Sequence, residues 1–434
     1  MKATMRNAII VFALTVVFTG LHAQVNPKLQ AQLDQQAQDI TPKVIEWRRH
    51  FHQFPELSFE EIKTGEYVAE FLKRLGLRVQ YPVGKTGVVA LLETGRPGPV
   101  IALRADMDAL PVKERSNLPF ASKERTVFNE QETGIMHACG HDSHMAMLMG
   151  VAEVLAKNRS NLRGIVKFIF QPGEEGEGGA AQMIKEGVLE NPKVDVIFGQ
   201  HIWATAPVGT ILYRPGDLMA AADLFSIKIK GRQTHGSAPW NGVDPIVIGS
   251  QIVMGLQTII SRQSELTKAA AILTVGRFNS GIRENIIPEE ANLSGTIRTL
   301  DEGMRDKIHQ KIKLTATKIA ESAGATADVE IGKFGYVTYN DPALTNKMLP
   351  TLQKAAGKDK VALTLPITGS EDFSEYQRVV PGLFFFTGGM PADADPSKVA
   401  AHHNPDFFID EKGFITGVRA MVDLTVDYMY ASRK

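Results

Sequence analysis

The segment MHACGHDSHMAML, residues 136–148, holds the residue types best suited to chemistry. Cys139 is the only cysteine of the chain, and His137, His141 and His144 lie close to it in sequence. Thiolate and imidazole are preferred ligands of zinc and other transition metals. Because a Cys-x-His motif is far less specific than a four-cysteine zinc motif, a metal site is indicated only if other segments supply further ligands.

Several predicted strands end in further residues that bind metals or transfer protons. VIALRADMD ends in Asp106 and Asp108, KFIFQPGEE ends in Glu174 and Glu175, and VDVIFGQHI ends in His201. Because the carboxyl ends of parallel strands meet at one edge of a sheet, we expect these side chains to lie close together. Adjacent carboxylates can divide the work, since one can bind a metal while its neighbour acts as a general base on water.

Each of these motifs also has a structural interpretation. An isolated histidine at a strand end is more often a structural residue than a ligand, and paired glutamates in a loop most often form a solvated turn. The late segment AAHHNPDFFIDE adds His402 and His403 to the candidates. The metal hypothesis therefore depends on the coincidence of all these residues at equivalent positions of the fold.

The elements that must position these residues are of two kinds. Residues 27–215 and 341–434 alternate predicted strands with helices, which is typical of an α/β domain with a mostly parallel central sheet. From about Gly216, alternating strands such as LFSIKIKGR and two long helices predict a smaller α+β unit with an antiparallel sheet. The expected fold is therefore an α/β catalytic domain interrupted by a smaller α+β insert.

Composition excludes several classes of partner. The chain has 48 Lys and Arg against 48 Asp and Glu, so its formal net charge is zero, and 44% of its residues are hydrophobic. These values are typical of a soluble globular protein. A neutral chain gives no reason to expect a nucleic acid or an anionic membrane as partner.

The first residues have the layout of a secretory signal peptide. Lys2 and Arg6 precede an apolar run over residues 8–21, and the small Ala23 follows as a predicted cleavage site. An N-terminal membrane anchor is the alternative, but the run is short for a membrane span. We therefore expect an exported protein, periplasmic or secreted, with no membrane contact in its mature form. A lone thiol in an oxidising compartment should be buried or metal-bound, because it has no disulfide partner.

Taken together, the motifs resemble the family of di-metal amidohydrolases related to aminoacylase and carboxypeptidase G. Within it the chain is most similar to the branch of N-acyl-amino-acid amidohydrolases, hippurate hydrolases and auxin-conjugate hydrolases. The resemblance extends over residues 42–430. The stretches that show it are RRHFHQFPELSFEE, ALRADMDALPV, MHACGHDSHMAML, IFQPGEEGEGGA, FGQHIWATAPVGTI, HGSAPWNGVDPI, ENIIPEEANLSGTIRT, TGSEDFSEY and HHNPDFFIDE.

The resemblance implies a set of ligands for two divalent metals. In this branch a cysteine, here Cys139, takes the bridging place of an aspartate, and Glu174 matches the general base. Asp106 matches an acid that orients a ligand, and Arg104 stands where other branches have a histidine ligand. The implied ligands are Cys139, His141, Glu175, His201 and His403. The donor types are compatible with zinc, manganese, cobalt or nickel.

The resemblance also implies a role for the insert. His235 matches a lid histidine that reaches the active site of a partner subunit, and Asn285 and Arg298 match residues that grip the substrate carboxylate. The insert would then be a ferredoxin-like lid and dimerisation domain on a phosphorylase/hydrolase-like catalytic domain, and the protein a homodimer. The expected limits are a signal peptide over 1–23, catalytic parts over 24–215 and 335–434, and a lid over 216–334.

The expected activity is metal-dependent hydrolysis of the amide bond in N-acyl amino acids, which releases a carboxylic acid and an amino acid. Alternatives within the same chemistry are an exported dipeptidase or carboxypeptidase and an N-acetyl-diaminopimelate deacetylase. A binding protein that has lost catalysis would lack a ligand or the base, and none is missing from this sequence.

Overall fold

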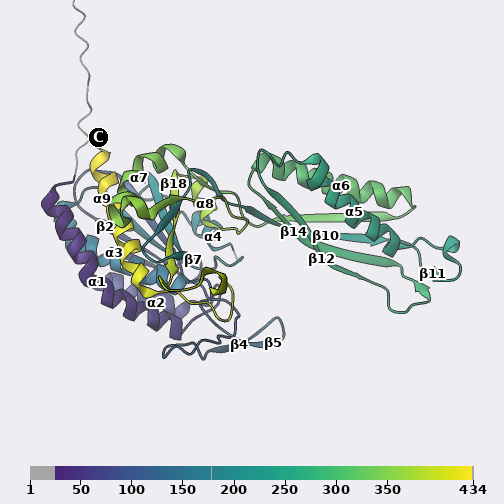
Figure 1. The fold of residues 1–434 in the computed structure, drawn as a ribbon, viewed down its shortest axis with the longest axis horizontal. Helices are drawn as coiled ribbons and strands as arrows, with labels where there is room; N and C mark the ends of the chain where they lie inside the picture. Colours follow the sequence, from purple (N-terminus) through teal and green to yellow (C-terminus); the bar gives the residue numbers. More distant parts are fainter. Residues whose placement is uncertain (1–24, 177, 433–434) are drawn as a thin grey trace, which may run out of the picture.

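The computed structural model describes residues 25–176 and 178–432, so the predicted signal peptide lies outside the described residues. The chain forms a main body, built around one large sheet, and an elongated insert that projects from it (Figure 1). None of the helices within the described ranges is both long and apolar enough to cross a membrane.

The main body contains an eight-stranded sheet in the order β1-β2-β6-β3-β7-β18-β8-β17. Its middle strands β6, β3, β7 and β18 run parallel, and β1 and β2 pair antiparallel to their neighbours. Strand β8 pairs antiparallel with β18 and parallel with β17. The strands are β1 (Arg78–Val83), β2 (Gly87–Glu93), β3 (Val100–Asp106), β6 (Ile165–Gln171), β7 (Val196–Pro207), β8 (Ile211–Tyr213), β17 (Val361–Leu363) and β18 (Gly382–Met390). The parallel middle confirms the predicted α/β class.

Helices cover both faces of this sheet. One face packs against α1 (Pro27–Gln53), α2 (Ile62–Arg74), α3 (His141–Lys157), α7 (Pro342–Ala356) and α9 (Phe414–Ala431). The other face packs against the short helices α4 (Gly179–Lys185) and α8 (Phe373–Gln377). Neighbouring strand residues such as Phe384 and Phe385 belong to opposite cores, because successive side chains of a strand point to opposite faces.

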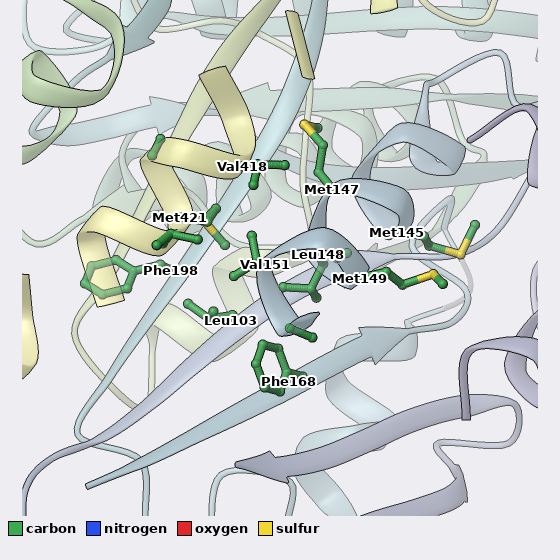
Figure 2. Packing of buried hydrophobic residues seen from close by; sticks show 14 of the residues in the cluster. Leu103, Met145, Met147, Leu148, Met149, Val151, Phe168, Phe198, Val418 and Met421 are labelled. Atoms are coloured by element: carbon green, nitrogen blue, oxygen red, sulfur yellow. The ribbon is translucent and has the colours of Figure 1, made fainter. Parts of the chain in front are cut away.

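Helix α3 lies between the sheet and the outer helices α1 and α9. Figure 2 shows Leu148 and Val151 near the sheet residues Leu103 and Phe168, and all four belong to one hydrophobic core. Almost every residue of α3 is buried, which explains why its sequence is apolar on all sides. The metal-ligand candidates at its N-terminus are therefore mounted on one of the best-packed elements of the molecule.

The insert is a second layer structure with its own core. Its four strands are antiparallel in the order β12-β14-β10-β15, and Figure 1 shows both helices over one face. The elements follow as β10 (Ala221–Lys230), α5 (Pro245–Gln263), β12 (Ala271–Ser280), β14 (Glu290–Thr299), α6 (Glu302–Ser322) and β15 (Thr326–Lys333). This βαββαβ order is ferredoxin-like, as predicted.

Small two-stranded sheets complete the fold. β9 (Gly216–Met219) pairs with β16 (Thr338–Asn340) where the chain enters and leaves the insert. β11 (Thr234–His235) pairs with β13 (Ile286–Ile287), and Figure 1 places β11 at the end of the insert far from the main body. β4 (Arg125–Phe128) and β5 (Gln131–Gly134) form a hairpin.

Candidate active site

A cavity of about 630 Å³ lies at the carboxyl edge of the parallel strands, between the main body and the near end of the insert. This edge is the expected place for a site in an open α/β sheet. The main body contributes Cys139, Glu174, Glu175, His201, His402 and His403 to its wall, and the insert contributes Arg298. Strand ends and a helix N-terminus that are distant in sequence thus meet at one cavity.

Cys139 and His141 are positioned by the start of α3. Gly140 between them has φ +94°, a left-handed conformation that favours glycine, and it forms the N-terminal cap of the helix. The Cys139 Sγ lies 3.4 Å from His201 Nε2. Burial, followed by the charge of Glu175, raises the pKa of the thiol well above its usual value. A cation bound at the sulfur would reverse this balance, because metals favour the thiolate.

His141 and His201 each have one ring nitrogen at a backbone carbonyl oxygen, and the other ring nitrogen faces the candidate metal ligands. His201 Nδ1 lies 2.5 Å from the carbonyl oxygen of Ile202, which leaves Nε2 facing the sulfur of Cys139. His141 Nδ1 lies 2.8 Å from the carbonyl oxygen of Asp108, and its buried Nε2 finds no hydrogen-bond partner among residues 25–176 and 178–432. Such backbone bonds fix the tautomer of metal-binding histidines.

The two histidines of HHNP differ in whether a ring nitrogen is left free of backbone bonds. His402 uses both nitrogens on the backbone, since Nδ1 lies 3.1 Å from the Cys139 oxygen and Nε2 accepts from Ala204 N at 3.2 Å. His403 has φ +66°, and its Nε2 lies 3.2 Å from the Oε1 of Glu175. His403 is therefore the one with a ring nitrogen at the carboxylate.

These donors fit two divalent metal ions. Ligand atoms of Cys139, His141 and His201 lie within 4.8 Å of one another, and so do those of Cys139, Glu175 and His403. Cys139 belongs to both groups, as a bridging ligand would. Within the described residues, the buried His141 Nε2 and Glu175 Oε1 form no hydrogen bond, since the 3.2 Å contact of Oε1 with His403 Nε2 is an ion-pair contact only. Leaving both atoms unbonded would be costly unless a cation satisfied them. Mixed thiolate, imidazole and carboxylate donors suit first-row transition metals.

Glu174 lies beside this cluster and faces further acids. One of its carboxylate oxygens is 4.0 Å from His141 Nε2, and oxygens of Glu174, Glu371 and Asp372 form a group within 4.8 Å. Burial, and then the charges of Glu371, Glu175 and Asp372, raise the pKa of Glu174 well above its usual value. A carboxylate with a raised pKa is a stronger base, which suits proton transfer near neutral pH.

A buried network of ion pairs, which was not predicted from the sequence, lies next to the metal-ligand candidates. The Arg104 guanidinium, 1% exposed, donates to Asp106 at 2.5 Å and to Asp372 at 2.8 Å, and lies 2.9 Å from Glu371. In the sequence, Glu371 and Asp372 stood out only as part of the stretch TGSEDFSEY. The available signal for a buried ion-pair network was that this stretch has three acids and no cation of its own. Arg104 thus holds acids together from opposite ends of the chain.

Asp106 contacts His144, a histidine outside the implied ligand set, more closely than the implied ligand His141. Its oxygen accepts from His144 Nδ1 at 2.5 Å, while His141 Nδ1 is 3.9 Å away. His144 in turn accepts from Ile202 N at 2.7 Å, next to His201 in β7. The direct contact with His141 belongs to Asp108, whose carboxylate lies 3.3 Å from Nδ1.

The insert residues separate into two groups. Arg298 is half-buried in the cavity wall, where its Nη1 donates to Ser370 Oγ at 2.9 Å. His235 and Asn285 are exposed and lie together at the far end of the insert, where the backbone N–H of Gly236 donates to the backbone carbonyl oxygen of Asn285 at 2.8 Å. Neither of these two residues lines the cavity of its own chain.

The sequence pattern of Peptidase family M20/M25/M40 matches residues 102–427. The chain belongs to this family. It is 39% identical to an N-acetyl-L-cysteine deacetylase of Bacillus subtilis, with 87% of this chain and 86% of the relative covered. It is 38% identical to the thermostable carboxypeptidase 1 of Saccharolobus solfataricus, over 92% of this chain and 99% of the relative.

The fold is also that of a solved family member. A Bacillus subtilis protein described as a dinuclear metal-binding peptidase of family M20 superposes with a TM-score of 0.75 at 34% identity, covering 90% of this chain and 99% of that structure. The M20 chain described here is accordingly a metal-dependent hydrolase of amide bonds that uses two divalent metals.

Proposed function

We propose that this M20 hydrolase cleaves the amide bond of N-acyl amino acids and releases a carboxylic acid and a free amino acid. The observation that supports it most is the placement of Glu174 beside a two-metal donor set in a cavity whose wall also contains the cation Arg298. A related deacetylase of N-acetyl-L-cysteine supports the same substrate class.

Two bound divalent metals would polarise the substrate carbonyl and lower the pKa of water. Glu174 then accepts the proton from the attacking water and returns it to the leaving nitrogen. Five further residues would hold the metals in place: Cys139, His141, Glu175, His201 and His403. Zinc, manganese, cobalt and nickel all suit this donor set.

Arg298 is proposed to bind the α-carboxylate of the substrate, because a planar guanidinium can hold a carboxylate through two parallel hydrogen bonds. Asn285 would assist it. Apolar side chains of Met219, Leu224, Phe334 and Ile367 line the same cavity and offer a surface for the acyl group.

We further propose that His235 and Asn285 act in the cavity of a second copy, where His235 would stabilise the oxyanion. Their exposure at the far end of the insert supports action outside their own chain. The protein would then be a homodimer, with a lid over residues 216–334 and catalytic parts over 24–215 and 335–434. Residues 1–23 would direct export to the periplasm or beyond the cell.

The reaction class is tested with protein from Gln24 onward, stripped by a chelator and reloaded separately with each of the four metals. Amine release is measured from N-acetyl, N-benzoyl and indole-acyl amino acids and from plain dipeptides. We expect metal-restored release from acyl amino acids at a higher kcat/KM than from dipeptides. Release from dipeptides alone would favour a dipeptidase, and no release at all with two metals bound would contradict the proposal.

Action across subunits is tested by mixing two inactive variants, Glu174→Gln and His235→Ala. In a mixed dimer one site has both an intact Glu174 and an intact His235 from the partner, so an equal mixture should recover about a quarter of wild-type activity. Exchange of subunits is verified by mass. If mixed dimers form without recovering activity, His235 acts in its own chain or not at all.

A further inference from the structure

The segment Glu56–Glu61 between α1 and α2 was singled out in the sequence, but the proposed reaction gives it no role. In the structure this segment bonds to two loops that carry acids, the loop after β3 and the loop after β6. The backbone N–H of Ala109 donates to the backbone carbonyl oxygen of Glu56 at 2.8 Å, and Leu57 forms a parallel bridge with Ala109. The N-terminal end of the segment therefore holds the loop after β3. The other end, at Glu61, holds the loop after β6.

Glu61 is a fully buried carboxylate with two partners. One oxygen accepts from the backbone N–H of Gly173 at 2.9 Å, and the other accepts from Thr86 Oγ1 at 2.5 Å. Gly173 immediately precedes Glu174 and has φ +60°. A Cβ at Gly173 would come within 2.9 Å of the Phe59 ring, so the same segment also supports the loop by direct contact.

The residue after Glu174 is held in the same way. Asp108 Oδ2 accepts from the backbone N–H of Glu175 at 3.0 Å and from Ser58 Oγ at 2.7 Å. Two buried carboxylates, Glu61 and Asp108, therefore bind the backbone amides on either side of Glu174. Burial and the charge of Asp108 raise the pKa of Glu61 to about 7, so near neutral pH its hold on the loop depends on the position of its oxygen at the Gly173 N–H more than on its charge.

We propose that Glu61 is a positioning residue that, together with Asp108, clamps the backbone on both sides of Glu174 and so sets the location of its carboxylate. This inference rests on the proposed role of Glu174 as general base. Displacement of a catalytic group by about 1 Å can reduce the rate about 100-fold. Reach, rather than charge alone, is the property that Glu61 supplies.

Two conservative variants separate reach from charge. Glu61→Asp keeps the carboxylate but is one methylene shorter, so it no longer reaches Gly173 N–H without a shift of the loop. Glu61→Gln keeps the length and an oxygen acceptor but loses the charge. We expect kcat to fall about 100-fold in Glu61→Asp and less than about 10-fold in Glu61→Gln, with KM nearly unchanged and two metals bound in both.

A matched control is Asp423→Asn, which alters a buried carboxylate on α9 that bonds Gln30 and neither loop. It should leave kcat within about 2-fold of wild type. A second readout does not require activity: hydrogen exchange of the peptide that contains residues 172–176 in metal-loaded protein. Exchange should be faster in Glu61→Asp than in Glu61→Gln or in Asp423→Asn.

The outcomes separate this inference from the proposed function. Wild-type kcat and unchanged exchange in Glu61→Asp would overturn the clamp, as would a greater loss in Glu61→Gln than in Glu61→Asp, or loss of metal as the sole defect. If wild-type protein hydrolyses no amide while exchange follows the expected order, the clamp stands as a structural restraint and the proposed function fails.

Discussion

The main body and the insert use polar residues in opposite ways. In the main body, most acids and histidines at the sheet edge are buried or half-buried, and several bond to groups far away in the sequence, as Asp372 does to Arg104. In the insert, His235 and Asn285 are exposed at a tip that touches no part of the cavity. Arg298, at the near end, joins the two through its hydrogen bond to Ser370.

This difference indicates where geometry is set by one chain and where it needs another surface. The main body holds the donor histidines His141 and His201 through backbone carbonyl oxygens of the same chain. The tip of the insert has polar groups and the exposed side chains of Trp240 and Ile282, 76% and 96% exposed, with nothing from the described residues covering them. Experiments should therefore distinguish the contribution of the metal-ligand candidates in the main body from that of His235 and Asn285 at the far end of the insert.

The largest effect is expected at Glu174. Glu174→Gln removes the base but keeps the size of the side chain, so kcat should fall about 10³- to 10⁴-fold while two metals stay bound. Steady-state kinetics and metal analysis measure the two quantities. Near wild-type turnover would show that the main body does not supply the base, and the comparison of the two regions would lose its basis.

The pH dependence of stability should differ between the two regions. Burial raises the pKa of Asp423, on α9 of the main body, to about 6. Since the folded pKa exceeds the unfolded value, protonated Asp423 stabilises the fold at low pH, and this contribution is lost as pH rises through about 6. The loss amounts to about 2 kcal/mol between pH 4 and pH 7.

Asp223 in the insert has the opposite sign. Burial opposes ionisation, but hydrogen bonds from Arg305 and His309 prevail and lower the pKa of Asp223. Its stabilisation is present above the unfolded pKa and is lost on acidification. Denaturant unfolding at several pH values should show a flatter profile for Asp423→Asn, and for Asp223→Asn a loss that shrinks towards low pH. Parallel profiles for both variants and wild type would contradict the assignment.

The smallest effect is expected at the junction of the two regions. Arg298→Lys keeps the charge but loses the planar fork, so KM should rise about 10-fold, or about 1.4 kcal/mol, with kcat little changed. An N-acyl amine without a carboxylate is the control substrate, and its kcat/KM should stay the same. An equal loss on both substrates would assign Arg298 to holding the cavity wall through Ser370 rather than to the carboxylate.

Much of the fold was predictable because periodicity changes plainly along the chain. Alternation in LFSIKIKGR marked the antiparallel insert, and apolar strands ending in acids marked the parallel sheet. The gathering of Asp106, Asp108, Glu174, Glu175 and His201 followed from one rule, that carboxyl ends of parallel strands share an edge. The pairing of Arg104 with Glu371 and Asp372 followed from no local pattern.

The sequence by itself determined which residue types reach the sheet edge and that a glycine links the thiol to the first helical histidine, because these depend on local conformation. The tertiary structure decided which nitrogen or oxygen of each residue is free, which carboxylate bonds the amide before Glu174, and which insert residues meet the cavity. These depend on contacts such as Glu61 with Gly173, which lie 112 positions apart, and long-range packing is not encoded in any local pattern.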